Sequence, residues 1–417
     1  MGVIQRELFK TLRSTPKLLL EKFISNKLDK YGINDKKLCA TLADRMLSGD
    51  FSEFTWDADV EPDKNIEFTE EDRIDFDKII ENFLSKEIAE IVSDLTSEAA
   101  IDIVKGLLAR WPEVKISENA DSYHFCQRLD LRWAKGIDPL KMLHIASREI
   151  GERYAERLRK TKAQKGISRR QVTFLLHARA CQTTLEILTL AEHGLADGAF
   201  ARWRTLYEIA VVAFVIDRFG DSIAEKYLEH DIVSTKELVD IERRYNPQAY
   251  SKKFVHAVQE NFNYVIEKYG SSFSSPYGWA ITETDRKRPT FQDIEKLVDW
   301  GSLSPNYKLS SQKVHAGAAG LLNSISMIGD NLQIASGATN AGLEVPIVNT
   351  AYTLTQITSL LYTGRKTIDD QIEMLSLCSL RDQAERECRK AAQQLHRDEL
   401  QLKERRHPNL HSSVEPQ

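Results

Sequence analysis

Apolar residues recur at steps of three and four along most of the chain, the spacing that gathers them on one face of a helix. Between these runs stand short segments rich in Gly, Pro, Ser and Asp, which are typical of turns. No segment shows the sustained alternation of apolar and polar residues that indicates a strand. The pattern predicts an all-α fold, a multi-helix bundle. A short helix is expected to end near residue 47. The other helices are expected over 3–28, 69–95, 97–111, 121–135, 138–165, 168–193, 197–219, 221–245, 248–269, 290–300, 310–329, 346–363 and 367–406.

Local signals place several helix ends. Thr69 followed by Asp72 resembles a capping box, and Asp138 before Pro139 is typical of a helix start. Gly136 and Gly220 are expected to end helices, because glycine tolerates the backbone conformation that follows a last turn.

The longer interruptions divide the chain. Residues 48–68 and 270–289 lack a helical period and are expected to be loops. We expect an N-terminal helical region over 1–120, a helical core domain over 121–365, and a charged C-terminal helix with a disordered tail over 366–417.

Composition narrows the class of protein. With 417 residues, of which 42% are hydrophobic, the chain can bury a large core, and a net charge of −5 disfavours general affinity for nucleic acid. Five scattered cysteines without a CxxC pair favour a reducing compartment and disfavour a structural zinc site. The N-terminus lacks an apolar secretory segment, and no apolar run is long enough to cross a membrane. We therefore expect a cytoplasmic protein that contacts no membrane.

Charge is unevenly distributed. Asp50 to Glu98 is strongly acidic, and Arg128 to Arg179 is strongly basic. Within the latter, Arg148–Arg170 alternates basic residues with glutamates at helical spacing. This is typical of a solvated face with salt bridges, and the alternative is a contact with nucleic-acid phosphates.

The longest apolar run, within residues 194–231, contains the most informative charged residues. Arg204 and Glu208 stand four apart and share one helix face. If that face is buried, the two charges must serve each other. They form either a structural ion pair or part of a polar site walled by apolar helices.

Two histidines are candidate partners of that pair. His315 lies in a stretch with the small residues Ala316, Gly317, Ala319 and Gly320, which would let two helices approach closely, and we predict that its ring lies near Arg204 and Glu208. His230 is the second candidate, and His177 is weaker. A satisfied core or rim histidine is the alternative in each case.

Short catalytic and cofactor motifs are absent from the sequence. It has no Walker A loop, GxGxxG, HExxH, GxSxG or EF-hand loop, and it lacks the two Glu-x-x-His motifs on facing helices that a di-iron bundle needs. No cofactor and no metal are expected, and whether the protein is an enzyme stays open.

Three separated stretches resemble a known family. ADGAFARWRTLYEIAVVAFVI, AEKYLEHD and YKLSSQKVHAG occur in the order found in the bacterial family called domain of unknown function 5677. The resemblance covers about residues 170–365 and rests on Arg204, Leu206 and Glu208, then Ser311, Val314 and His315. It implies no reaction, because the family has no established activity.

Two classes of function remain. The first is a defence- or toxin-like effector that acts on RNA or a nucleotide, with Arg204 stabilising phosphate charge, His315 or His230 moving a proton, and Glu208 orienting one of them. The compact Arg-x(4)-His spacing of helical nucleases is missing around Arg204. The second is a non-enzymatic scaffold or sensor that binds a partner protein or a second copy of itself.

Overall fold

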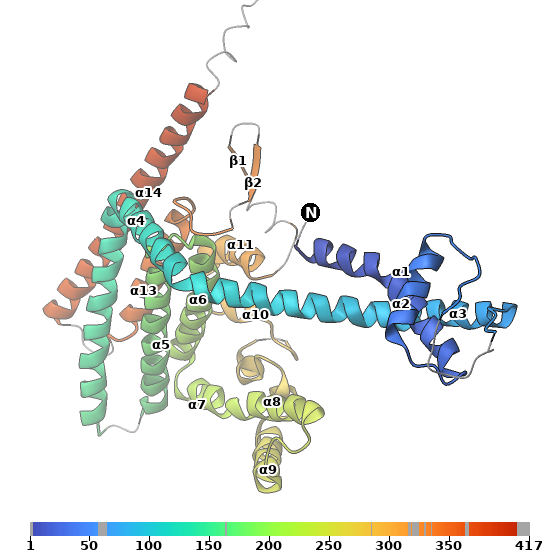
Figure 1. Ribbon diagram of the computed structural model, residues 1–417. Coiled ribbons are helices and arrows are strands. Elements are labelled where there is room, and N and C mark those ends of the chain that lie inside the picture. The colour runs from blue at the N-terminus through green and yellow to red at the C-terminus, as the bar shows by residue number, and fades with distance from the viewer. Residues whose placement is uncertain are drawn as a thin grey trace, which may run out of the picture. The chain divides into compact units, whose positions relative to one another are not determined.

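The computed structural model describes residues 3–56, 65–162, 165–284, 286–315, 318, 325–328, 331–334, 336–362 and 367–406. The chain forms two compact units, Met1–Ala120 and Asp121–Gln417. Helices dominate both (Figure 1), which confirms the predicted all-α, multi-helix fold. The expected disordered tail after residue 406 lies outside the described residues.

Unit 1 contains α1 (Val3–Asp29), α2 (Lys36–Leu47), α3 (Glu70–Asn82), the π-helical turn η1 (Phe83–Glu87) and the first part of α4 (Ile88–Lys160). A buried ion pair between Lys27 of α1 and Asp72 of α3 joins two of these helices. The predicted capping box is confirmed, since Asp72 also accepts a hydrogen bond from the Thr69 backbone. A small core surrounds these contacts: Leu20, Phe23, Ile24, Leu28, Ile33, Leu38, Cys39 and Ala43.

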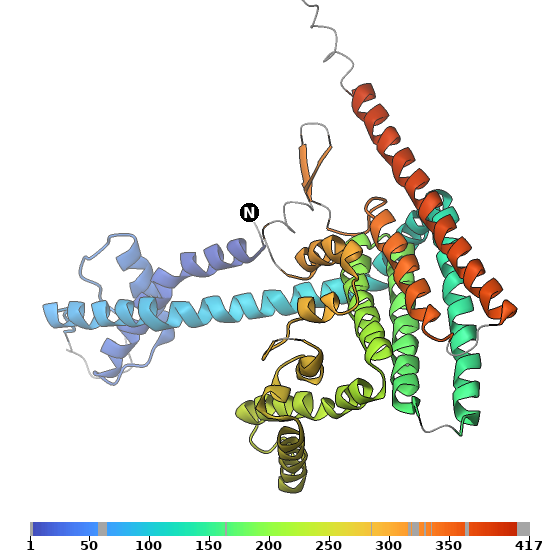
Figure 2. The ribbon, with the colours of Figure 1, turned by 180° about the vertical axis from the view of Figure 1, so that it is seen from behind.

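Unit 2 is built around α6. Figures 1 and 2 show α5 and α13 beside it, with α14 packed on α13. The helices are α5 (Ile167–Glu192), α6 (Ala196–Phe219), α7 (Asp221–Glu229), α8 (Asp231–Tyr245), α9 (Lys252–Tyr269), α10 (Phe291–Lys296), α11 (Ser304–Val314), α13 (Glu344–Ser359) and α14 (Ile368–Arg406). Short 3-10 turns cover Ser271–Ser274 (η2), Gly278–Glu283 (η3) and Gly301–Leu303 (η4).

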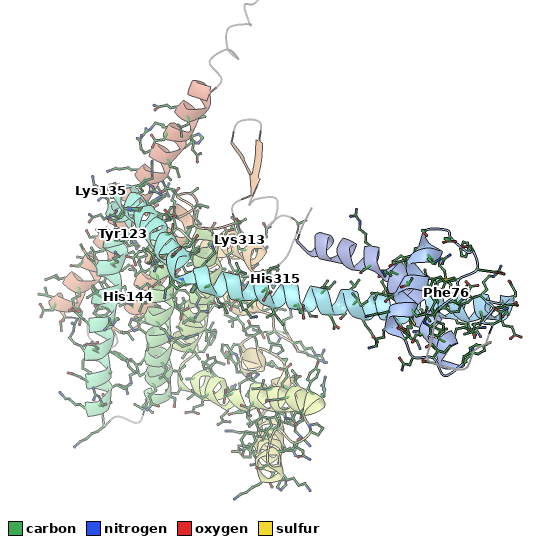
Figure 3. All side chains as sticks on the ribbon, in the orientation of Figure 1. Phe76, Tyr123, Lys135, His144, Lys313 and His315 are labelled. Atoms are coloured by element: carbon green, nitrogen blue, oxygen red, sulfur yellow. The ribbon has the colours of Figure 1, made fainter. Side chains whose placement is uncertain are left out.

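The predicted helix ends near Pro112 and Gly136 are wrong, because α4 continues through both. A helix can continue through a proline when it gives up one hydrogen bond and bends. The ring of Pro139 interferes with the carbonyl four residues earlier, at Lys135, and Figure 3 shows α4 changing direction near Lys135. Pro139 and Leu140 are both buried, and their burial compensates for the backbone hydrogen bond that the helix loses at Pro139.

Three other predicted helices differ from the structure. The helix expected over 221–245 is interrupted at His230, where α7 ends and α8 begins. The helix expected over 310–329 ends at Val314, and β1 (Ile325–Ile328) pairs antiparallel with β2 (Asn331–Ile334). The expected small-residue face at 316, 317, 319 and 320 lies outside the described residues. The predicted loop over 270–289 instead contains the turns η2 and η3.

Gly136 provides a test of the packing between α4 and α14. A Cβ at this position would stand 2.4 Å from Cys388 Sγ and 3.1 Å from the Cys388 backbone nitrogen. Gly136→Ala should therefore lower the free energy of unfolding by about 1–3 kcal/mol, despite the better helix propensity of alanine. Urea denaturation followed by tryptophan fluorescence measures the loss.

Gly198→Ala is the matched control in the same unit. Its Cβ would meet Leu190 at 3.5 Å, an ordinary contact, so stability should stay within about 0.5 kcal/mol of wild type or rise. Equal effects of the two substitutions would contradict the close packing at Gly136.

Candidate functional site

Arg204 and Glu208 form an ion pair on α6. Their side chains stand one turn apart, with Arg204 Nη2 3.2 Å from Glu208 Oε1. The predicted pair is confirmed, and its helix face is only partly buried. The two side chains are 26% and 35% exposed.

Tyr307 of α11 completes the pair. Its hydroxyl donates a hydrogen bond to Glu208 Oε1 at 2.7 Å and accepts one from Arg204 Nη2 at 3.1 Å. The Arg204 guanidinium also lies 5.0 Å from the centre of the Tyr307 ring, within range of a cation–π contact. Burial and the bond to Glu208 raise the pKa of the Tyr307 hydroxyl above its ordinary value, so it stays protonated and can donate.

A cavity of about 620 Å³ opens beside this cluster. Glu208 lines it from α6, and His230 and Asp231 line it from the junction of α7 and α8. Aromatic side chains contribute much of the remaining wall: Tyr227, Tyr277, Trp279 and Phe291. Arg204, although bonded to Tyr307, is not among the residues that line the cavity.

His230 is held by the backbone that follows α9. Its Nε2 lies 2.9 Å from the carbonyl oxygen of Ser275, so this nitrogen carries the proton and donates. The ring packs edge-on against Phe273, with centres 5.1 Å apart. Burial lowers the pKa of His230, and the bond to Ser275 opposes this only in part. The ring is therefore neutral near pH 7.

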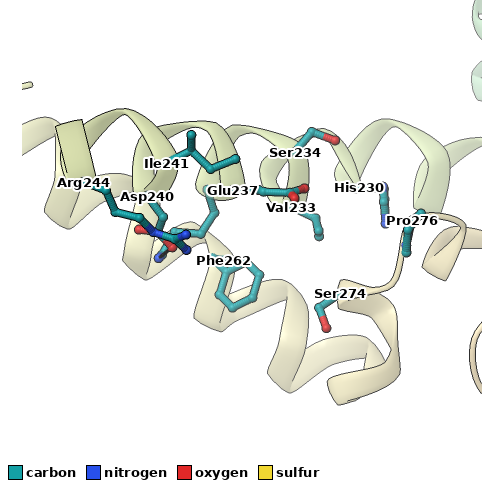
Figure 4. Close-up of a pocket in the computed structure, with 11 residues that line it drawn as sticks. His230, Val233, Ser234, Glu237, Asp240, Ile241, Arg244, Phe262, Ser274 and Pro276 are labelled. Atoms are coloured by element: carbon teal, nitrogen blue, oxygen red, sulfur yellow. Dashed lines mark hydrogen bonds and ion pairs between the residues drawn. The ribbon is translucent and has the colours of Figure 1, made fainter. Parts of the chain in front are cut away.

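A second cavity of about 570 Å³ adjoins the first and shares His230, Ser234 and Pro276 with it (Figure 4). Its charged lining belongs to α8, where Lys236 and Asp240 form an ion pair. Because His230 belongs to both linings, it stands at the boundary between the two cavities.

His315 is exposed at the C-terminal end of α11 (Figure 3). Its backbone N–H bonds to Ser311, and among the described residues no hydrogen bond or ion pair joins its ring to Arg204 or Glu208. The expected buried position in a close helix–helix contact is wrong, because the helix ends one residue before it. Of the four predicted site residues, Glu208 and His230 both line the cavity. Arg204 is linked to it only through its ion pair with Glu208, and His315 does not line it.

A family model described as "Family of unknown function (DUF5677)" matches residues 170–332. The resemblance expected from the sequence is therefore confirmed over these residues. No curated protein and no solved structure gave a significant match. The DUF5677 region contains every residue of the cluster and of the first cavity, whereas α4, α13 and α14 lie outside the match.

Tyr307 was missed as a site residue, although it opens the YKLSSQKVHAG stretch of the DUF5677 resemblance. Tyr277 was missed as well, because it falls in the segment without helical period. An aromatic residue at the start of a matched stretch was the available signal for Tyr307. Nothing in the local pattern distinguished Tyr277 from other loop residues.

His177 and Cys181 form a buried contact in unit 2 that is structural rather than catalytic. His177 Nε2 lies 3.2 Å from Thr358 Oγ1, and the ring contacts Cys181. Burial lowers the pKa of His177 to about 4 and raises that of Cys181 to about 12. A neutral thiol beside a neutral ring is a poor nucleophile.

The basic stretch Arg148–Arg170 forms several internal contacts. Arg153 pairs with Glu373 of α14, and Arg169 pairs with Asp217 of α6 at 3.3 Å. These pairs favour the salt-bridge interpretation, and the nucleic-acid contact stays a prediction.

Within the described ranges, no group of three or more His, Cys, Asp or Glu side chains is placed to hold a metal ion. No described helix combines the length and apolar character needed to cross a membrane.

Removing the Tyr307 hydroxyl tests the cluster. Tyr307→Phe deletes one bond to a carboxylate and one from a guanidinium, and should lower the free energy of unfolding by about 1–2 kcal/mol. Combined with Glu208→Gln, the loss should be smaller than the sum of the single losses, because both changes remove the same bond. Tyr264→Phe, at an exposed tyrosine, is the control and should leave stability unchanged. Additive effects would contradict the coupling.

The buried histidines predict the pH dependence of unit 2. Burial lowers the pKa of His144, His177 and His230, so the unfolded chain binds protons at a higher pH than the folded chain does. Their contribution is complete above about pH 6.5 and is lost as the pH falls toward 4, by about 2 kcal/mol at pH 5 for His177 alone. Urea midpoints measured across this range test the direction.

Two variants test whether His177 causes this pH dependence of stability. His177→Gln removes the buried titrating ring, so its stability should vary less between pH 7 and pH 5 than that of wild type. His256→Gln, at an exposed histidine, should keep the wild-type profile. An unchanged profile in His177→Gln would show that other groups cause the loss.

Proposed function

We propose that unit 2 is a non-enzymatic sensor that binds a small organic cation in the cavity beside Glu208. The observation that carries the proposal is the lining itself, in which carboxylates stand among aromatic side chains. Among the described lining residues, the acidic groups are Glu208 and Asp231, and there is neither lysine nor arginine. A cation with an apolar body fits both kinds of wall.

The hydrogen bonds around the cavity help to keep its lining negatively charged. Arg204 is held by Glu208 and Tyr307, which keeps its guanidinium outside the lining. His230 is neutral because burial lowers its pKa, so it adds no positive charge. The carboxylate of Asp231 therefore has no cationic competitor within the lining.

The aromatic walls supply the apolar contact. Trp279 is buried, and Tyr227 meets it edge-on with ring centres 5.2 Å apart. Tyr277 and Phe291 stand with ring centres 6.3 Å apart. A desolvated cation against such faces gains about 2 kcal/mol from cation–π attraction.

The cavity lies between several helices, which is an arrangement suited to a sensor. Glu208 approaches it from α6, whereas Tyr227 and Asp231 approach it from α7 and α8. A bound ligand would join these helices and stabilise one arrangement of them. That difference between free and bound protein is what a partner protein could recognise.

Action on RNA or a nucleotide, the other function expected from the sequence, receives less support. A phosphate would meet Glu208 and Asp231 in this cavity, and Arg204 is already bonded to two partners. The sequence predicted that His315 moves a proton, but among the described residues no hydrogen bond joins its ring to Arg204 or Glu208. The free cysteines support the expectation of a reducing, cytoplasmic setting.

Calorimetric titration with choline tests the proposal. Its neutral isostere, 3,3-dimethyl-1-butanol, has the same shape without the charge. We expect choline to bind at least about tenfold more tightly, equivalent to about 1.4 kcal/mol, and to raise the melting temperature. Glu208→Gln and Asp231→Asn should each weaken choline binding about tenfold.

Glu237→Gln is the matched control, because this carboxylate lines the second cavity but not the first. It should leave choline binding unchanged. If choline, tetramethylammonium and phenyltrimethylammonium all fail to bind, or if the neutral isostere binds equally well, the proposal is overturned. Cleavage of RNA by the purified protein that is lost in His230→Ala would instead favour the effector hypothesis.

A further inference from the structure

Three cavities of unit 2 meet at Pro276. This residue lines the cavity beside Glu208, the second cavity along α8, and a third cavity of about 440 Å³. The second and third cavities also share Ser274 (Figure 4). A ligand in the cavity beside Glu208 could therefore extend past Pro276 into the third cavity.

The charge of the lining changes sign from the first cavity to the third. Among the described residues, the first lining carries the carboxylates of Glu208 and Asp231 and neither lysine nor arginine. In the second lining, two basic residues balance two acidic ones: Lys236, Arg244, Glu237 and Asp240. The described lining of the third cavity contains Arg288 and no acidic residue. An anionic group is therefore favoured in the third cavity and disfavoured in the first.

The third cavity also offers several hydrogen-bond donors. Apart from Arg288 and Pro276, its described lining consists of serines: Ser271, Ser272, Ser274 and Ser275. The hydroxyls of Ser274 and Ser275 donate to the carbonyl oxygens of Ser271 and Ser272. Within the described part of the chain, no hydrogen bond engages the hydroxyls of Ser271 and Ser272 or the guanidinium of Arg288. These three side chains are free to donate to a ligand.

The serine segment is held in place by packing and backbone hydrogen bonds. Phe273 is 2% exposed and stacks on Tyr269, with ring centres 4.6 Å apart. The carbonyl oxygen of Ser275 accepts bonds from His230 Nε2 at 2.9 Å and from the Gly278 backbone at 2.8 Å. A Cβ at Gly278 would stand 2.0 Å from the Phe273 carbonyl oxygen, so the chain can approach itself this closely only at a glycine. The segment is therefore ordered before a ligand binds, which lowers the entropic cost of binding.

We propose that the ligand of unit 2 is a zwitterion, an organic cation that also carries a phosphate monoester. Its phosphate binds in the third cavity, to Arg288 and to the hydroxyls of Ser271 and Ser272. A guanidinium donates two parallel N–H bonds to a phosphate. A phosphate monoester has three acceptor oxygens, enough for the guanidinium and both hydroxyls, whereas a carboxylate has two. This inference rests on the proposed cation site and adds the second charged group of its ligand.

Calorimetric titration of the full chain with matched pairs of ligands tests the proposal. Each pair is a trimethylammonium alcohol and its phosphate monoester, with two, four or six carbons between the charged groups. The shortest pair is choline and phosphocholine. We expect at least one phosphate to bind at least about tenfold more tightly than its own alcohol.

Arg288→Gln tests whether the gain comes from the third cavity. It should remove the gain of the phosphate and leave the affinity for the alcohol unchanged. Lys287→Gln is the matched control, because it removes the same charge from a neighbouring residue that does not line the cavity. It should keep both affinities. Both side chains are exposed, so circular dichroism should show both variants as helical as wild type.

The outcomes separate this inference from the cation site. If choline binds and no phosphate binds more tightly than its alcohol, this inference is overturned and the cation site stands. Equal weakening of alcohol and phosphate in Arg288→Gln, or loss of the gain in Lys287→Gln, would overturn the assignment to the third cavity. Binding to phosphatidylcholine vesicles in place of the soluble ligands would overturn the monoester, because the lipid phosphate is a diester. Failure of every ligand in the series would overturn the proposed function together with this inference.

Discussion

The burial of α6 on nearly all sides is the constraint on which the rest of unit 2 depends. Trp203, Leu206 and Tyr207 are fully buried, and α5, α10, α11 and α13 all contact this helix. Such burial favours folding through the hydrophobic effect, but it also makes an unpaired polar group on α6 costly. The positions of the surrounding elements follow from how those polar groups are satisfied.

Polar side chains on α6 bond to several of the elements that surround it. Trp203 donates to Thr353 of α13, which fixes one neighbour. Tyr207 reaches Glu295 of α10 and the carbonyl of Trp300, and Arg204 and Glu208 share Tyr307 of α11. These hydrogen bonds join the short elements between Phe291 and Val314 to α6. The same bonds leave Glu208 at the edge of a cavity.

The proposed cation site lies within the part of the chain that matches the DUF5677 family model. The charge of the cavity comes from few residues, so small changes at Asp231 or Glu208 would alter its preference for ligands.

Local sequence determined the helical character of the chain and several of its helix ends. The period of apolar residues is a property of short segments, and caps such as Thr69 with Asp72 need only neighbours in the chain. The spacing of Arg204 and Glu208 likewise determined that they pair, because four residues make one turn. Only tertiary packing decided that α4 continues through Pro139, since the burial of Pro139 and Leu140 offsets the hydrogen bond that the helix loses there. Packing also decided that His230 meets Ser275 and that Tyr307 meets Glu208, contacts between residues far apart in the chain. No local period encodes which distant segment covers a given helix face, because that choice depends on the joint packing of all the helices.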